Sequence, residues 1–216
     1  MKKILNGPSI RPKSELKNAI IFLHGYGANG NDLISIADLW KNSFKETIFL
    51  SPNAPFKCAW GDDAYQWFDL TSISPDKIGE GLNTAGPFLN EYVDDILKVY
   101  SLNSEQIFFV GFSQGTMMAL YHLCKRVDKC AGIMGYSGLL FQDKEFDSKV
   151  KSKFPIKLYH GKNDEVIDYS QTINSAEKFK SLEFDVENKI QDNLRHGIDN
   201  EGLKFGFNFI KKTFNI

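Results

Sequence analysis

The residue with the clearest chemical meaning in this sequence is Ser113, which lies in the stretch Gly111-Phe112-Ser113-Gln114-Gly115. The stretch matches the pattern G-x-S-x-G, in which a serine occupies the strained apex of a tight turn between a strand and a helix. A β-branched and aromatic run precedes it and a helix-forming run follows it, as the pattern requires. We therefore predict a nucleophilic serine. The competing interpretation is a glycine-rich turn whose serine does no chemistry or binds phosphate.

A serine hydroxyl needs a base, and the sequence offers both a base and an acid in a meaningful order. Asp164 and His196 follow Ser113, and Ser, Asp, His is the chain order of α/β-hydrolases. An imidazole titrates near neutral pH, so His196 can take the serine proton and return it to the leaving group. A buried Asp164 carboxylate would fix the imidazole tautomer and stabilise the imidazolium. We expect activity to rise with pH as this base loses its proton.

Each of these assignments has a competitor elsewhere in the chain. His24 precedes a glycine-rich turn and His160 precedes the acid loop, so we expect both to be structural. His122 lies in the helix after the serine and is expected to be structural or exposed. Asp168 competes with Asp164, but it lies nearer the next predicted helix, which it could cap. The histidines lack metal-ligand spacing such as H-E-x-x-H, so no metal site is predicted.

The negative oxygen that forms during acyl transfer requires fixed hydrogen-bond donors. The backbone N–H of Gln114, directly after the nucleophile, is the first predicted donor. The N–H of Tyr26, in the turn His24-Gly25-Tyr26-Gly27, is the second. Loss of one such donor typically costs about 3–4 kcal/mol of transition-state stabilisation. We therefore predict that the two N–H groups form an oxyanion hole.

Buried strands alternate with amphipathic helices along the chain. Continuous apolar runs predict strands at residues 19–24, 47–51, 107–112, 131–136 and 155–160, and an alternating run predicts an edge strand at 184–190. Helical spacing predicts helices at 31–43 (capped by Asn31-Asp32), 85–101, 170–181 and 200–213, and one directly after Ser113. Residues up to 18 suit a short edge strand or arm. This order predicts a single α/β domain over residues 1–216, with a mostly parallel sheet, helices on both faces and no large cap domain.

This alternation gives the scattered polar residues a common location. In open parallel sheets, active sites gather at the carboxyl ends of the strands. Ser113, Asp164 and His196 all fall at or just beyond the end of a predicted strand. The sheet is therefore expected to bring them together, although they are far apart in the sequence.

Residues 53–83 form a long predicted loop that is rich in aromatic side chains. A loop of this length inside a compact domain is usually functional. We therefore expect Trp67 and Phe68, together with Leu139, to contact an apolar part of the substrate. The alternative is that the aromatic residues only clamp the loop to the core.

The composition limits the possible partners and the cellular compartment but does not identify a substrate. Among 216 residues, 26 Lys or Arg nearly balance 27 Asp or Glu, so nothing favours nucleic acid or an anionic membrane as partner. Three cysteines without paired spacing argue against a disulfide framework and a zinc site. No apolar run is long enough to cross a bilayer, and polar residues interrupt the start before a signal-peptide core forms. We predict a reducing, cytoplasmic compartment.

Several motifs together resemble those of the phospholipase/carboxylesterase group of small α/β-hydrolases, which includes acyl-protein thioesterases and bacterial carboxylesterases. They run in family order across nearly the whole chain. The most specific is Trp67-Phe-Asp-Leu70, which generic α/β-hydrolases do not carry. The others are Phe22-Leu-His-Gly-Tyr-Gly, Pro52-Asn-Ala-Pro55, the stretch from Gly111 to Ala119, Tyr136-Ser-Gly138, His160-Gly-x-x-Asp164-x-Val166 and His196-Gly197.

This resemblance implies a triad of Ser113, Asp164 and His196, with Tyr26 and Gln114 at the oxyanion hole. It implies hydrolysis of carboxylic esters or thioesters with an apolar acyl group, whether carried by a small molecule, a lipid or a protein, with no cofactor. It also allows a homodimer, which no residue pattern decides. Arg195 departs from the small or apolar residue common before the base and leaves substrate preference open. The alternative function is a non-catalytic hydrolase-fold protein that binds a small apolar ligand.

Overall fold

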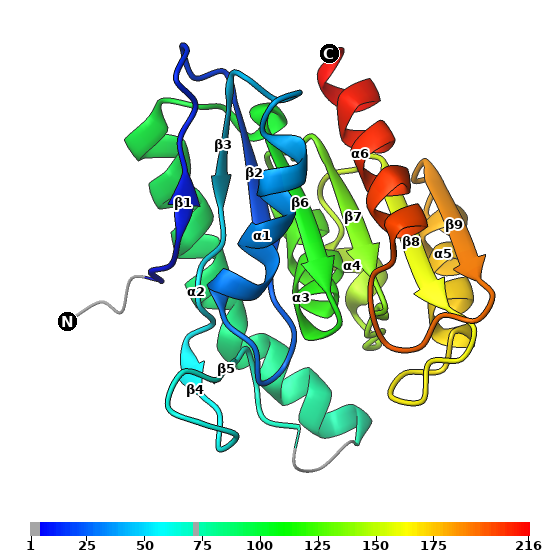
Figure 1. Cartoon of the computed structure of the whole chain (residues 1–216). Helices are drawn as coiled ribbons and strands as arrows, with labels where there is room; N and C mark the ends of the chain where they lie inside the picture. Colours follow the sequence, from blue (N-terminus) through cyan, green and yellow to red (C-terminus); the bar gives the residue numbers. More distant parts are fainter. Residues whose placement is uncertain (1–4, 71–73) are drawn as a thin grey trace.

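The central sheet is the frame that places every candidate site residue. The computed structural model describes residues 5–70 and 74–216. Seven strands follow the order β1-β3-β2-β6-β7-β8-β9, all parallel except β1, which pairs antiparallel with β3 at one edge (Figure 1). The strands are β1 (Ser9–Ile10), β2 (Asn18–Leu23), β3 (Thr47–Leu50), β6 (Ile107–Phe112), β7 (Gly132–Tyr136), β8 (Ile156–Gly161) and β9 (Val186–Gln191). The predicted mostly parallel sheet is confirmed, as is the short edge strand in the N-terminal arm.

Helices cover both faces of this sheet (Figure 1). One face carries α1 (Gly30–Trp40) and α6 (Asn200–Phe214), and the other carries α2 (Pro75–Tyr100), α3 (Gln114–His122), the short α4 (Phe146–Lys149) and α5 (Ser170–Ser181). Strand side chains alternate between the two cores: in β2, Ile20 and Phe22 pack under α1 and α6, while Ala19, Ile21 and Leu23 pack on the opposite side. Because both faces are buried, strands β2, β3, β6 and β7 are almost entirely apolar.

The long helix α2 begins at Pro75, ten residues before the predicted start at residue 85, so that boundary was wrong. Ser74 accepts a hydrogen bond from the Lys77 N–H (3.3 Å), and Pro75 occupies the first turn. The predicted loop at 53–83 is correspondingly shorter and contains a hairpin of β4 (Phe56–Lys57) and β5 (Tyr65–Gln66). Residues 71–73 of that loop lie outside the described part of the chain.

The start of α1 also differs from the prediction. Its N-cap is Asn29, whose side chain accepts a hydrogen bond from the Asn31 N–H (2.8 Å) and whose own N–H donates to the Asp32 carboxylate (2.7 Å). This reciprocal arrangement is a capping box. The residues predicted to cap the helix therefore lie inside its first turn, and the helix ends at Trp40 rather than near Ser43.

Candidate active site

Ser113 occupies the sharp turn between β6 and α3 that the sequence predicts. Its backbone angles, φ 52° and ψ −115°, lie in a region that residues with a side chain rarely adopt. A Cβ atom on Gly115 would lie 1.9 Å from the Leu23 carbonyl oxygen, and one on Gly111 would lie 2.6 Å from Cα of Thr116. The two flanking positions therefore leave no room for a side chain, and the strained turn sets Ser113 at the carboxyl end of the sheet.

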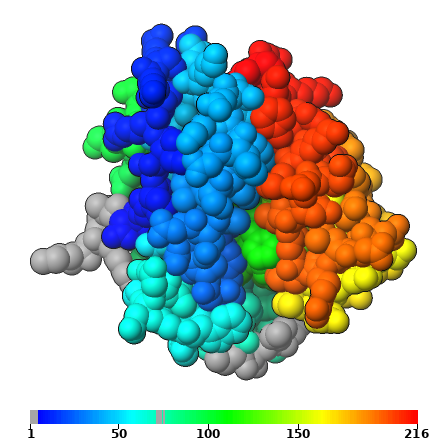
Figure 2. All heavy atoms as spheres, viewed as in Figure 1, coloured from blue at the N-terminus to red at the C-terminus, as the bar shows by residue number. Residues whose placement is uncertain are grey.

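The turn reaches the molecular surface. Ser113 is largely buried but keeps 7% of its surface exposed. In the space-filling view, green atoms of the segment that includes β6 and α3 show between the blue atoms around α1 and the orange atoms of the last third of the chain (Figure 2). A small substrate group can therefore approach this segment from solvent.

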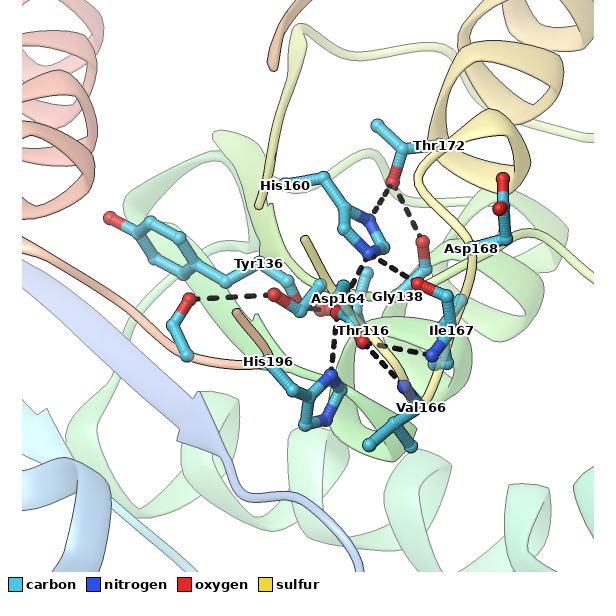
Figure 3. A network of polar contacts seen from close by, with 12 residues as sticks. Thr116, Tyr136, Gly138, His160, Asp164, Val166, Ile167, Asp168, Thr172 and His196 are labelled. Carbon is cyan, nitrogen blue, oxygen red and sulfur yellow. Dashed lines mark hydrogen bonds and ion pairs between the residues drawn. The ribbon is translucent and has the colours of Figure 1, made fainter. Parts of the chain in front are cut away.

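Asp164 follows β8 and uses both carboxylate oxygens. Oδ1 accepts hydrogen bonds from the Val166 N–H (2.8 Å) and the Ile167 N–H (2.9 Å). Oδ2 lies 2.7 Å from Nδ1 of His196 and 2.9 Å from Nε2 of His160 (Figure 3). Burial pushes the pKa of Asp164 upward, but the amide and imidazole donors outweigh that effect and hold the pKa below its ordinary value. The side chain is completely buried and ionised at neutral pH.

His196 lies on the loop between β9 and α6, with its side chain 19% exposed. Because a carboxylate only accepts, Nδ1 carries the proton that it donates to Asp164, and Nε2 is left as an acceptor. The ring centroid lies 5.0 Å from that of Phe112, the residue directly before Ser113. The imidazole therefore lies between the acid and the turn. Within the described residues the Ser113 hydroxyl makes no hydrogen bond. In enzymes without substrate, the hydrogen bond between a catalytic serine and its histidine is often long and shortens only when substrate binds.

Two tyrosines of the central strands hold the loop that carries His196. The Tyr159 hydroxyl donates to the carboxylate of Asp199 (2.7 Å), which also caps α6 by accepting the Gly202 N–H (2.8 Å). The Tyr136 hydroxyl donates to the Gly202 carbonyl oxygen (2.8 Å). These tyrosines were not predicted to have a role, although a hydroxyl in a buried strand indicates that each needs a specific hydrogen-bond partner.

The turn that contains Tyr26 lies directly beside the nucleophile. A Cβ atom on Gly25 would lie 3.3 Å from Cβ of Ser113. Among the described residues, no protein acceptor bonds the N–H of Tyr26 or the N–H of Gln114, which opens α3. Both donors are therefore available to a ligand oxygen, as the sequence analysis expects.

His24 braces this turn through both of its ring nitrogens. Its Nε2 accepts a hydrogen bond from the Ala54 N–H (2.9 Å), so Nδ1 carries the proton and donates to the Gly25 carbonyl oxygen (2.7 Å). Burial lowers the pKa of His24, which keeps the ring neutral. The contacts agree with the structural role expected for this histidine.

The side chain of Gln114 ties the aromatic segment to the nucleophile turn. Its Oε1 accepts from the Trp67 N–H (2.8 Å), its Nε2 donates to the Phe68 carbonyl oxygen (2.7 Å), and the Trp67 indole donates to the His24 carbonyl oxygen (3.0 Å). Trp67 has no exposed surface and Phe68 has 2%. For Trp67 the structure favours the clamp over the pocket wall, because a side chain without accessible surface supports the site from behind. Leu139 is half-buried.

The remaining competitors have other partners. Asp168 accepts the Ser170 N–H (2.9 Å) at the start of α5, and in Figure 3 it lies away from His196. His122 is buried within α3 and donates from Nε2 to the Leu82 carbonyl oxygen (2.9 Å). Neither residue takes part in the network around Asp164.

Similarity to known proteins places this arrangement in a family. A family model described as phospholipase/carboxylesterase matches residues 8–214. The chain belongs to the phospholipase/carboxylesterase family. This family member is 32% identical over 171 residues to acyl-protein thioesterase 1 of Schizosaccharomyces pombe, which covers 76% of this chain and 75% of that protein. It is 23% identical over 202 residues to esterase YpfH of Escherichia coli, covering 94% of this chain and 85% of that protein.

Solved structures agree with the family assignment. The crystal structure of esterase PE8 is 32% identical, with a TM-score of 0.93 over 97% of this chain and 99% of that chain. The Bacillus cereus carboxylesterase, at 17% identity, shares the fold with a TM-score of 0.79, covering 96% of this chain and 93% of that chain. This family member is thus an α/β-hydrolase that cleaves carboxylic esters or thioesters, and the alternative of a non-catalytic binding protein is set aside.

Proposed function

We propose that this family member cleaves esters or thioesters through an acyl-enzyme on Ser113. His196 is the proposed base, and Asp164 is the carboxylate that orients it. The observation that carries the proposal is the 2.7 Å hydrogen bond between Nδ1 of His196 and Oδ2 of Asp164. This bond fixes the tautomer of His196 that leaves Nε2 free to accept a proton. The His196 ring also packs against Phe112, the residue before Ser113.

The proposed reaction has two half-reactions. Ser113 Oγ attacks the acyl carbonyl carbon while Nε2 of His196 takes the hydroxyl proton, and Asp164 stabilises the imidazolium. The Tyr26 and Gln114 N–H groups bind the carbonyl oxygen as it becomes negative. The imidazolium then protonates the leaving alcohol or thiol, which departs and leaves an acyl ester on Ser113. Water, deprotonated by His196, releases the acid by the reverse sequence, so the mechanism uses only protein groups and water.

Leu139 is the proposed contact for the apolar acyl group, with Phe68 and Trp67 supporting the wall. Leu139 follows Gly138, where a Cβ atom would lie 2.9 Å from the Ser113 carbonyl oxygen, so this loop adjoins the nucleophile. Its half-buried side chain keeps surface for an acyl chain. Burial of each methylene contributes about 0.8 kcal/mol, which would reward a longer apolar acyl group.

Covalent labelling tests the nucleophile directly. A fluorophosphonate should form one adduct, located on Ser113 by peptide mass spectrometry, and Ser113→Ala should lower kcat/KM by at least about 10³-fold without loss of the folded state. Ser51→Ala is the matched control, because Ser51 is also buried and follows β3 at the same edge of the sheet. Undiminished ester cleavage by Ser113→Ala, or equal labelling of both variants, would contradict the triad.

A chain-length series tests the acyl preference independently of the triad. Matched esters and thioesters from acetyl to palmitoyl should show kcat/KM rising with apolar chain length, and Leu139→Ala should flatten the rise. A preference for acetyl that Leu139→Ala leaves unchanged would remove the apolar-pocket proposal while leaving the nucleophile assignment intact. The ratio of ester to thioester rates in the same series assigns the leaving group.

The setting is part of the proposal. Cys58, Cys124 and Cys130 are buried free thiols, which supports a reducing, cytoplasmic compartment. Among the described residues, no helix has the length and hydropathy to span a bilayer. We propose that residues 1–216 act as one catalytic unit, and sedimentation of the purified protein would test for the homodimer that the resemblance allows.

A further inference from the structure

A second histidine contacts the acid carboxylate from the side opposite the base. His160 lies near the end of β8, and its Nε2 is 2.9 Å from Oδ2 of Asp164 and 2.9 Å from the carbonyl oxygen of Ile167 (Figure 3). Its Nδ1 is 2.6 Å from the hydroxyl of Thr172 in α5. The side chains of His160 and Asp164 are completely buried, so no solvent competes for these bonds.

The proton positions follow from the partners. Carboxylate and carbonyl oxygens only accept, so Nε2 of His160 carries a proton that both share. Burial lowers the pKa of His160, while Asp164 and the Ile167 carbonyl oxygen act to raise it. The Thr172 hydroxyl lies 2.6 Å from Nδ1 and donates to the Gly138 carbonyl oxygen (2.9 Å). Thr172 thereby holds the ring in the orientation that points the Nε2–H donor at Asp164.

We propose that His160, held in its orientation by Thr172, is a positioning residue that sets the orientation and charge of Asp164 toward His196. The inference rests on the proposed triad and adds a fourth and a fifth member to it. With this bond the carboxylate has four donors, two on each oxygen. The four donors therefore hold the Asp164 carboxylate in one orientation. Because Oδ2 accepts from both imidazoles, its negative charge is shared between His160 and His196.

A pH consequence distinguishes this role from simple packing. Without the His160 donor, Oδ2 presents more negative charge to Nδ1 of His196, which stabilises the imidazolium. The rise of kcat/KM should then move to higher pH. The other charged groups on the surrounding loops stay in place: Asp168 at the start of α5, the exposed pair of Glu165 with Arg195, and the exposed pair of Lys162 with Asp192.

The test uses two amides that each imitate one ring nitrogen. His160→Gln places an N–H group where Nε2 donates to Asp164, whereas His160→Asn places its amide near the position of Nδ1 and leaves Asp164 without that donor. We expect His160→Asn to lower kcat/KM roughly tenfold and to move its acidic limb upward by about half a pH unit. His160→Gln should keep the wild-type limb. Thr172→Val should shift the limb in the direction of His160→Asn, and Thr172→Ser should restore it.

Every outcome decides the inference. Equal losses in His160→Asn and His160→Gln with an unmoved acidic limb would show a purely structural residue and overturn it. If His160→Asn does not fold, as judged by circular dichroism, the Thr172→Val and Thr172→Ser pair carries the same decision. Fluorophosphonate titration of each variant counts competent Ser113, so a failure of the triad itself would appear as absent labelling in the wild type, separately from any result at His160.

Discussion

Two parallel strands of the sheet lead into the same dipeptide, and the two histidines in it have different partners. His24-Gly25 follows β2 directly, and His160-Gly161 closes β8. Both rings are completely buried, and burial lowers the pKa of each. His24 bonds only backbone groups, one as donor and one as acceptor. His160 bonds a hydroxyl, a backbone carbonyl and the carboxylate of Asp164.

The difference shows that one buried group serves two purposes according to its acceptor. A neutral imidazole with one donor and one acceptor can join two segments at the end of a strand without leaving a polar atom unsatisfied. Against backbone groups, as at His24, this joins the oxyanion turn to the segment that contains Ala54. Against a carboxylate, as at His160, we propose that the same geometry also changes the charge that His196, the proposed base, experiences.

Replacing His24 is expected to have the largest effect and tests whether the two histidines differ in function. His24→Leu leaves the Ala54 N–H and the Gly25 carbonyl oxygen without their partners in a buried site, so we expect the free energy of unfolding to fall by about 2–4 kcal/mol. Urea denaturation measures this loss. Activity should fall at every pH while the acidic limb stays in place, in contrast to His160→Asn. A moved limb in His24→Leu would mean that the two histidines are not functionally distinct.

His122 sharpens the comparison because it is a buried histidine away from the strand ends. Burial lowers its pKa from 6.5 to about 4. The folded-state pKa lies below the unfolded value, so the stabilisation is complete above pH 6.5 and is lost as the pH falls toward 4. His122→Gln keeps a donor for Leu82 but cannot titrate. It should reduce the acid-induced loss of stability by about 1–3 kcal/mol, as measured by denaturant titrations across this range.

An equal loss of stability in the two proteins would contradict this prediction for His122. If His122→Gln and the wild type lose the same stability between pH 6.5 and 4, protonation of this ring does not limit acid stability. The acid sensitivity would then belong to His24 and His160, whose pKa values are lowered by burial as well.

The smallest expected effect is at Arg195, the charged residue directly before the base. Its guanidinium pairs with Glu165, and both side chains are more than 70% exposed, at 74% and 72%. Exposed pairs contribute about 0–1 kcal/mol, so Arg195→Ala should change the free energy of unfolding by less than about 1 kcal/mol. For a neutral ester its pH profile should move less than that of His160→Asn. A larger movement would place the controlling charge on the surface instead of at Asp164.

Much of the framework could be predicted because it depends on local patterns. The central strands β2, β3, β6 and β7 are nearly continuous apolar runs, and Gly111 and Gly115 mark the turn at Ser113. The rule that sites gather at the carboxyl ends of parallel strands then selected Asp164 and His196 without knowledge of their contacts. Each of these signals is contained in a few neighbouring residues.

The parts that were missed depend on partners distant in sequence or on competing local signals. The start of α2 at Pro75 was hidden by Gly79 and Gly81 in its first turns, which are more typical of a loop. Trp67 was expected at a pocket, but Gln114 and the His24 carbonyl hold it inside the core. The bond from His160 to Asp164 was missed although the residues are only four apart, because the ring orientation that allows it depends on a contact with Thr172 of the following helix.

The base loop joins the site from the far edge of the sheet, after β9, whereas Ser113 stands at the end of the central strand β6. In chain order, Ser113 and the proposed oxyanion donors at Tyr26 and Gln114 are synthesised before His196, the proposed proton acceptor. A chain interrupted before β9 would carry a serine that has no means of activation. If the proposed triad is correct, copies of the chain that end before His196 should not cleave esters or thioesters.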